Sequence, residues 1–208
     1  MRPSAKASTC SCTMATAMSG PGWDLWNEPD NPVGQYADDI PAKLARVAVL
    51  PPRVFQWARS ADPTQPLTSG VRHDAGWDRP EGLNAIEKTQ LSQSGVISFH
   101  NYDWPEVFEA RVKSQQGYGR PLLCTEYMAR GNGSTFDTIL PLGKKRDVAM
   151  INWGFGNGKT RTDLPWDGWQ RPYTLKPPTA WFHDILRGDG TPYRAREVEI
   201  IRTLTARE

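Results

Sequence analysis

The sequence lacks long hydrophobic runs. Its uninterrupted apolar stretches are only a few residues each, far short of the ~20 residues of a membrane-spanning helix, so no such segment is expected. Cysteine is also scarce: Cys10, Cys12 and Cys124 are the only three, and they match neither a disulfide framework nor a zinc-binding spacing. The redox compartment of the protein is therefore left open.

Charge of one sign is scarce as well. The 25 basic and 23 acidic residues leave a formal net charge of +2 and are well mixed along the chain. Because no basic stripe is present to follow a phosphate backbone, nucleic acid is not an expected partner. With 38% hydrophobic and 23% charged residues among 208, the composition is that of a globular chain of one or two domains.

Tryptophan, by contrast, is plentiful. Of the nine tryptophans, several lie beside Gly, Pro, Asp or Asn rather than within helical repeats, namely Trp23, Trp26, Trp104, Trp153, Trp166 and Trp169. This placement indicates aromatic surfaces in loops and at strand ends. Flat rings that line a cleft suit the C–H faces of sugars. Core packing is the alternative for each ring.

The N-terminal stretch differs from the rest. Residues 1–22 are mostly Ser, Thr, Ala, Met and Gly without periodicity, and we expect them to form an unstructured leader. No apolar block of seven or more residues follows Arg2 and Lys6, so the stretch does not qualify as a secretory signal peptide, and localisation is left open. Residues 23–208 are expected to form the folded domain.

Short apolar runs alternate with amphipathic ones in that domain. The apolar runs predict strands at 22–26, 66–71, 96–100, 121–125 and 148–153. The amphipathic runs predict helices within 44–61, broken at Pro51 and Pro52, within 83–91, from Pro105 to 112, and at 136–140 with Ser134 as the cap. After a long loop to about Pro178, helices are predicted at 181–186 and 197–204.

Strict alternation of strand and helix indicates an α/β fold with a parallel sheet covered by helices. Such folds place their ligand-binding loops at the C-terminal ends of the strands. In this sequence those ends carry Asn27-Glu28-Pro29, His100-Asn101-Tyr102-Asp103, Glu126-Tyr127 and Trp153.

Two carboxylates, Glu28 and Glu126, follow separate apolar runs and should project over the mouth of the sheet. Glycoside hydrolysis requires such a pair: one carboxyl group protonates the leaving oxygen, and the other attacks or activates water. The alternative for either residue alone is a solvated loop position.

Four motifs in the expected order then resemble the clan A glycoside hydrolases. Residues Trp23–Pro29 (WDLWNEP) resemble the end of strand 4 in that clan. His100-Asn101-Tyr102 resembles the end of strand 6, Thr125-Glu126-Tyr127 that of strand 7, and Asn152-Trp153-Gly154 that of strand 8. Glycoside hydrolase family 5, with its cellulase-like endo-β-1,4-glycanases, is the most similar family within the clan.

The resemblance implies a retaining mechanism in which Glu28 is the general acid/base and Glu126 the nucleophile. In such enzymes the two carboxyl groups lie ~5–5.5 Å apart, and the pKa of the acid is raised by its surroundings while the nucleophile stays charged. Asn27 would hydrogen-bond the sugar 2-hydroxyl at the cleaved bond.

The remaining site residues follow from the same resemblance. Tyr102 would donate its hydroxyl to Glu126, and His100 would line the same floor, since residues two apart in a strand share a face. Trp153 would be the platform under the reacting sugar, and Trp166 could extend the cleft. No cofactor is implied, and no metal is expected, because His73, His100 and His183 lack the spacing of metal ligands.

The resemblance covers only the last five β/α units. A (β/α)8 TIM barrel usually needs ~250 residues, and nothing in residues 1–22 resembles strands 1 to 3. We therefore expect a partial TIM barrel, the C-terminal part of a longer enzyme. Without strands 1 to 3, strands 4 and 8 would be open edges.

Three functions are compatible with the sequence. The first is hydrolysis of a β-1,4-linked polysaccharide of the cellulose, xylan or mannan type. The second is a truncated, non-catalytic carbohydrate-binding remnant. The third is a partial barrel that pairs with itself or with a partner chain. The sequence selects neither the glycan, nor endo or exo action, nor the oligomeric state.

Overall fold

The computed structural model describes residues 22–31, 39–72, 76–169, 171 and 173–206. The expected leader therefore lies outside the described residues, apart from Gly22. Among the described helices, none combines the length and hydrophobicity that crossing a membrane would take.

The described residues belong to two compact units. The first, here called the Glu28 unit, comprises the described residues of Thr13–His100 and Ala110–Leu123. The second, here called the Glu126 unit, comprises those of Asn101–Glu109 and Cys124–Glu208. The chain runs through both units along β3 (Ile97–Asn101), α4 (Pro105–Gln116) and β4 (Leu122–Tyr127), so each of these elements contributes to both.

All five predicted strands are present, and the architecture is mixed α/β with parallel pairing, as predicted. Strand β1 (Trp23–Asp24) pairs in parallel with β2 (Leu67–Thr68), and a single parallel bridge joins Val71 to Phe99 in β3. A three-stranded sheet has the order β3-β4-β5, in which β5 is Val148–Met150. The described strands do not close into a barrel.

In the Glu28 unit, prolines and polar caps set the limits of the helices. Helix α1 (Ile40–Ala48) ends before Pro51, and α2 (Pro51–Ser60) begins there, because proline lacks the N–H that would continue α1. Helix α3 (Ala85–Gln93) has a capping box in which Asn84 and Glu87 each accept the other's backbone N–H at 2.9 Å.

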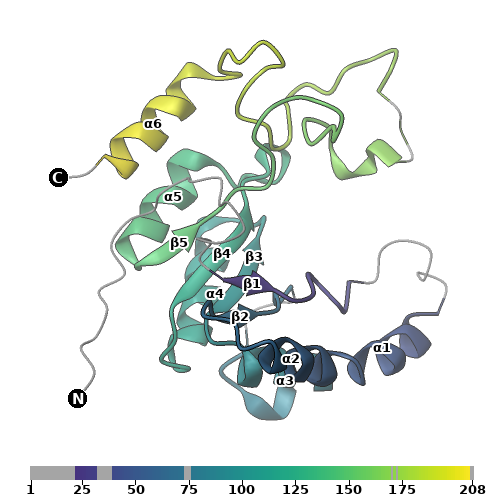
Figure 1. Cartoon of the computed structure of the whole chain (residues 1–208). Coiled ribbons are helices and arrows are strands. Elements are labelled where there is room, and N and C mark those ends of the chain that lie inside the picture. The colour runs from purple at the N-terminus through teal and green to yellow at the C-terminus, as the bar shows by residue number, and fades with distance from the viewer. Residues whose placement is uncertain (1–21, 32–38, 73–75, 170, 172, 207–208) are drawn as a thin grey trace. The chain divides into compact units, whose positions relative to one another are not determined.

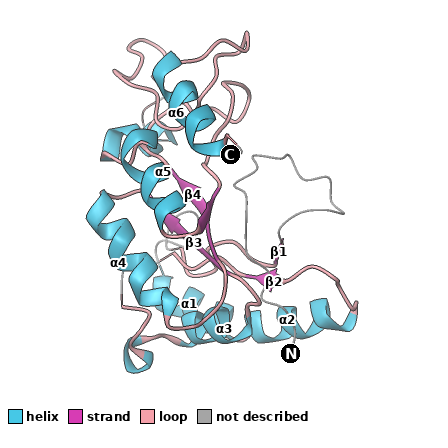
Figure 2. Ribbon diagram, turned by 90° about the vertical axis from the view of Figure 1, so that its left-hand side faces the viewer, coloured by secondary structure: helices cyan, strands magenta, loops and turns pink. Residues whose placement is uncertain are grey.

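These helices pack on the short strands of the same unit. Helix α3 lies beside α1 and α2 and contacts β2 (Figures 1 and 2). The fully buried apolar side chains include Phe55, Val71, Leu91, Ile97 and Phe99. The burial of these side chains forms an apolar core that stabilises β1 and β2, which are only two residues long.

In the Glu126 unit, α5 (Phe136–Lys145) packs against β5 and against the last helix, α6 (Ala195–Thr205) (Figures 1 and 2). The predicted cap of α5 is wrong by one residue. Thr135 is the cap and its N–H donates to the hydroxyl of Thr138, whereas the hydroxyl of Ser134 donates to the carbonyl of Asn101 at 3.4 Å. Ser134 is thus used to join two loops rather than to begin a helix.

The helix predicted at 181–186 is wrong. This segment is a loop whose backbone N–H groups bond to an earlier loop: Phe182 to Asp163 at 2.8 Å, His183 to Thr162 at 3.1 Å and Ile185 to Phe155 at 3.0 Å. The four residues 182–185 are all buried. A helix would expose part of such a run, so burial on both sides favours extended backbone paired with its neighbour.

Candidate active site

Glu28 stands on a tight turn four residues after the end of β1. The N–H of Asn31 donates to the carbonyl of Glu28 at 3.0 Å, and Pro29 occupies the second position of this turn, where its fixed φ is favourable. Glu28 itself has a φ of +44°, a left-handed conformation that is costly for a residue with a Cβ. Strain of this kind persists where the surrounding structure holds it, which is common at functional sites.

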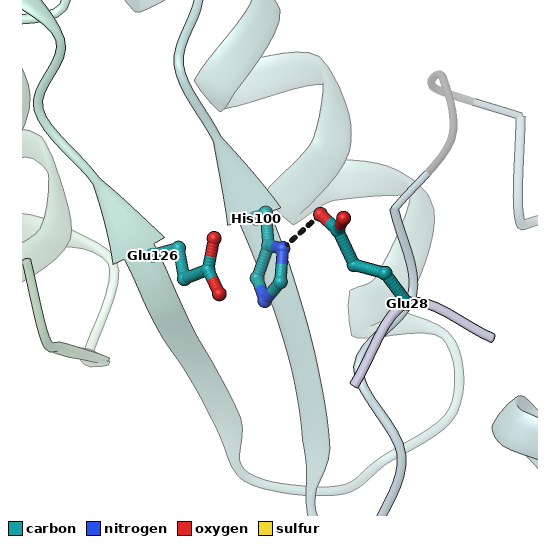
Figure 3. A group of neighbouring side chains, drawn as sticks. All are labelled: Glu28, His100 and Glu126. Atoms are coloured by element: carbon teal, nitrogen blue, oxygen red, sulfur yellow. Dashed lines mark hydrogen bonds and ion pairs between the residues drawn. The ribbon is translucent and has the colours of Figure 1, made fainter. Parts of the chain in front are cut away.

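The carboxylate of Glu28 has three polar partners within its unit. The ring Nδ1 of His100 donates to Oε1 at 2.5 Å, as Figure 3 shows. The side-chain amide of Asn31 donates to Oε2 at 2.5 Å, and Nε of Arg72 lies 3.8 Å from the same oxygen. His100 is 3% exposed, so the hydrogen bond to Glu28 is shielded from water.

These partners change the expected protonation of Glu28. Burial opposes the charged form, but the hydrogen bonds from His100 and Asn31 and the charges of His100 and Arg72 outweigh burial, so the pKa of Glu28 is lowered. The expectation of a raised pKa is therefore wrong. The donors brought to this carboxylate by the fold stabilise its ionised form more than desolvation disfavours it.

Gly70 has no side chain and therefore leaves room for the side chains around Glu28. A Cβ at Gly70 would lie 3.2 Å from Oδ1 of Asn27, 3.3 Å from Nε2 of His100 and 3.6 Å from Oδ2 of Asp24. Burial raises the pKa of Asp24, opposed in part by a hydrogen bond from the N–H of Trp26. Asn27, His100 and Asp24 thus converge over one glycine.

Glu126 lies near the end of β4 in regular strand backbone (Figure 3). The phenolic hydroxyl of Tyr102 donates to Oε2 of Glu126 at 2.8 Å, so the hydrogen bond that the sequence predicts between these two residues is present. Two residues before Glu126, Cys124 is fully buried and its thiol lies 3.5 Å from the carbonyl of Glu126.

Aromatic rings surround Tyr102 in the Glu126 unit. The ring of Trp166 meets that of Tyr102 edge to face at a centroid distance of 5.0 Å, and the ring of His183 does so at 5.4 Å. Phe182 supports Trp166 from 5.2 Å. Trp166 is nevertheless 48% exposed, and Trp153, which follows β5, is 45% exposed. Both rings therefore offer surface to a ligand.

His183 is neutral in this cluster. Its Nδ1 donates to the carbonyl of Met128 at 2.7 Å, which fixes the proton on Nδ1. Burial lowers the pKa of His183 to about 4, and the nearby charge of Arg130 acts in the same direction. At neutral pH the imidazole is therefore a packing group beside Tyr102 with no charge of its own.

A buried ion pair anchors the loop that carries His183. Arg130 donates through Nε and Nη2 to the two carboxylate oxygens of Glu197 in α6, at 2.8 and 2.6 Å. The same guanidinium donates to the carbonyls of Trp181 and Asp184, each at 3.0 Å. Arg130 thus ties α6 and the segment 181–184 together behind the aromatic cluster.

The structure adds site residues that the sequence does not predict. Asn31 is three positions after Glu28, and the turn typical of Glu-Pro-X-Asn could have pointed to it. Arg72 has no such local signal, because it lies 44 positions from Glu28 and reaches it only through the pairing of β1 with β2. The pairing of Arg130 with Glu197 has no local signal either, and the sequence shows His183 only as one of three histidines without metal-ligand spacing.

Comparisons with known proteins give a partial likeness. No protein-family model matches the chain, and no curated protein matches it in sequence. Among solved structures, the glycoside hydrolase family 5 mannosidase from Rhizomucor miehei is similar over 76% of this chain and 47% of its own, with 12% identity and a TM-score of 0.45. The β-glucuronidase 2 of Bacteroides uniformis, solved in covalent complex with cyclophellitol-6-carboxylate aziridine, is similar over 76% of this chain and 20% of its own, with 15% identity and a TM-score of 0.44.

The chain thus spans about half the length of the mannosidase and a fifth of the glucuronidase. Both TM-scores are below 0.5, so these likenesses carry no argument about the function of this chain.

Proposed function

We propose that this chain carries the catalytic carboxylates of a retaining glycoside hydrolase that cleaves a β-1,4-linked polysaccharide of the cellulose, xylan or mannan type. Its fold would be a partial (β/α)8 barrel built from the last five β/α units. The observation that carries the proposal is the hydrogen bond from the hydroxyl of Tyr102 to Glu126 at the C-terminal end of β4. A neutral donor of this kind orients a carboxylate and favours its ionised form, as a nucleophile requires.

In the first step, Glu126 attacks the anomeric carbon while the bond to the leaving oxygen breaks, and Glu28 gives its proton to that oxygen. In the second step, Glu28 takes a proton from water, the water oxygen attacks the anomeric carbon, and the carboxylate of Glu126 is released. Asn27 would bind the sugar 2-hydroxyl, Trp153 would lie under the reacting sugar, and Trp166 would extend the binding surface.

The acid role of Glu28 requires a proton that its lowered pKa disfavours. In the proposed mechanism, only the minor fraction of molecules in which Glu28 holds a proton would therefore carry out the first step.

A second candidate function is supported by the same carboxylate. If the lowered pKa of Glu28 persists with sugar bound, no acid is present at the leaving oxygen, and the chain binds glycans without cleaving them. The aromatic surfaces of Trp153 and Trp166 would serve such a binding protein equally well.

The test is Glu126→Gln, assayed on soluble β-1,4-linked glucan, xylan and mannan by release of reducing ends. We expect kcat/KM to fall by about 1,000-fold or more, the loss of roughly 4 kcal/mol of transition-state stabilisation. The matched control is Glu106→Gln, which changes an exposed carboxylate of the same unit and should leave turnover unaltered. Unchanged activity in Glu126→Gln would remove Glu126 as the nucleophile.

Two further observations separate the candidates. Glycan binding by the wild-type chain without turnover would select the binding protein. Hydrolysis with inversion of the anomeric configuration, or a crystal structure with the two carboxyl groups roughly 6.5–9.5 Å apart, would replace the retaining mechanism by an inverting one.

A further inference from the structure

Trp104 is an exposed aromatic side chain that the proposed catalytic steps do not use. It lies two residues after Tyr102 and is 61% exposed. Its carbonyl accepts the N–H groups of Val107 and Phe108, both at 3.1 Å, so its backbone is fixed where α4 begins. The side chain of Trp104 is therefore exposed even though its backbone is held by hydrogen bonds.

The ring of Trp104 is seated against Gly133. A Cβ built on Gly133 would lie 2.7 Å from Cη2 and from Cζ3 of the ring and 3.0 Å from Cε3, closer than real Cβ contacts allow. The six-membered ring of the indole thus occupies the space that the Cβ of any residue other than glycine would need at position 133. Gly133 also has a φ of +79°, which glycine adopts without strain.

The two loops that meet at this contact are tied together. The hydroxyl of Ser134 donates to the carbonyl of Asn101 at 3.4 Å, and the side-chain amide of Asn101 donates to the carbonyl of Asp103 at 3.1 Å. Both Ser134 and Asn101 are fully buried. The hydrogen bonds hold the segment 101–104 against the segment 133–134, so the ring has a fixed support.

A large aromatic ring that is both rigid and exposed is suited to stacking. It binds at little cost in conformational entropy, and its face matches the C–H face of a pyranose. The Cα atoms of Trp104 and Tyr102 are separated by two peptide steps, about 7.6 Å at most. Trp104 is therefore anchored in the same short segment as the side chain that holds Glu126.

We propose that Trp104 is a sugar-stacking platform for a pyranose unit of a β-linked glycan chain, beyond the sugar at the cleaved bond. The proposal rests on the proposed glycan-binding function and adds to it a dependence on chain length. A long oligosaccharide reaches Trp104, whereas a disaccharide confined to the cleaved bond does not.

The first test is Trp104→Ala, with oligosaccharides of two to six β-1,4-linked sugars titrated by calorimetry. We expect affinity for the longest oligosaccharides to fall about 10-fold, with less than about a twofold change for the disaccharide. Trp57→Ala is the matched control, because Trp57 on α2 is 59% exposed and lies in the other unit. Trp104→Phe should retain most of the affinity. Equal losses at every chain length, or none at any length, would overturn the proposal.

Gly133→Ala tests the support of the ring without removing it. The added methyl group would displace the indole and should reproduce the length-dependent loss. Gly190→Ala is the control for backbone strain, since Gly190 has a φ of +84° and no atom within 4 Å of its Cβ position. If the two alanine variants weaken long oligosaccharides equally, strain explains the effect and the platform is disproved.

The platform and the catalytic proposal fail in distinguishable ways. A chain that binds long oligosaccharides through Trp104 without turnover supports the platform and contradicts hydrolysis. A chain that hydrolyses short and long glycans with equal kcat/KM, unaffected by Trp104→Ala, keeps hydrolysis and overturns the platform. Binding of no oligosaccharide by the wild-type chain overturns the platform as well.

Discussion

Glu28 and Glu126 lie in contrasting surroundings. Glu28 stands on a strained turn and is bound by His100, Asn31 and Arg72, whereas Glu126 lies in regular strand backbone beside the neutral hydroxyl of Tyr102. The carboxylate of Glu28 is thus held by several polar and charged donors that contact it directly. Glu126 has the hydroxyl of Tyr102 as its donor, and Tyr102 is in turn held by aromatic packing and by a buried ion pair behind that packing. A carboxylate can therefore be positioned by many direct donors or by one donor whose own ring is firmly packed.

The largest expected effect is on the ion pair of the Glu126 unit. Glu197→Ala leaves Arg130 buried without its carboxylate, and removing one partner of a buried pair costs about 3–5 kcal/mol. Urea unfolding at pH 7 measures this loss. Glu109→Ala is the control, since it breaks the largely exposed pair of Glu109 with Arg146 and should change stability far less. Equal losses in the two variants would show that Arg130 finds other partners.

A smaller effect concerns the protonation of Glu28. Its pKa is lower in the folded chain than in the unfolded one, so ionised Glu28 stabilises the fold above about pH 4.5, and this contribution is lost as pH falls through the folded pKa. The His100→Ala variant lacks the main donor to Glu28, whereas the burial of Glu28 remains, so the pKa of Glu28 rises. The part of the pH dependence of folding stability that Glu28 contributes then becomes smaller. Carboxyl NMR of Glu28 against pH measures both values.

The control for this titration is Asp189, an exposed carboxylate whose pKa is lowered by hydrogen bonds from Thr191 and which His100→Ala should leave unaltered. A Glu28 pKa that does not move in His100→Ala would mean that Asn31 and Arg72 suffice to hold the charge.

The smallest effect is expected at Gly70. Gly70→Ala puts a methyl group 3.2–3.3 Å from Asn27 and His100, which must shift slightly, so we expect a loss of about 1 kcal/mol. Gly82→Ala is the control, because no atom lies within 4 Å of its Cβ position. Thermal unfolding of both variants measures the difference. Equal stability would indicate that the side chains around Glu28 adapt freely.

Local patterns in the sequence predicted most of the elements. The apolar runs located all five strands, and Pro51 and Pro105 marked helix starts, because proline acts on the backbone within one turn. The helix predicted at 181–186 is wrong because Trp181, Phe182, Ile185 and Leu186 have helix-like spacing, whereas the backbone N–H groups of residues 182, 183, 185 and 186 bond to residues 155–163, which lie 19 to 31 positions earlier. No local signal reports such a pairing.

The candidate site likewise has features that local sequence predicts and features that depend on long-range contacts. The hydrogen bond between Tyr102 and Glu126 was predicted, because strand-end motifs place both residues. The direction of the Glu28 pKa was predicted wrongly, because it depends on Arg72 and on how closely His100 approaches, and both are set by tertiary contacts. The pair of Arg130 with Glu197 spans 67 positions and was not predicted at all.

That last pair carries an evolutionary consequence. Arg130 uses its planar fork to serve four acceptors at once: two oxygens of Glu197 and the carbonyls of Trp181 and Asp184. Lysine keeps the charge but has a single nitrogen, so it could not reach all four. Positions 130 and 197 should therefore be inherited together or lost together among descendants of this chain. A lineage with Lys at position 130 should show compensating changes in the segment 181–184.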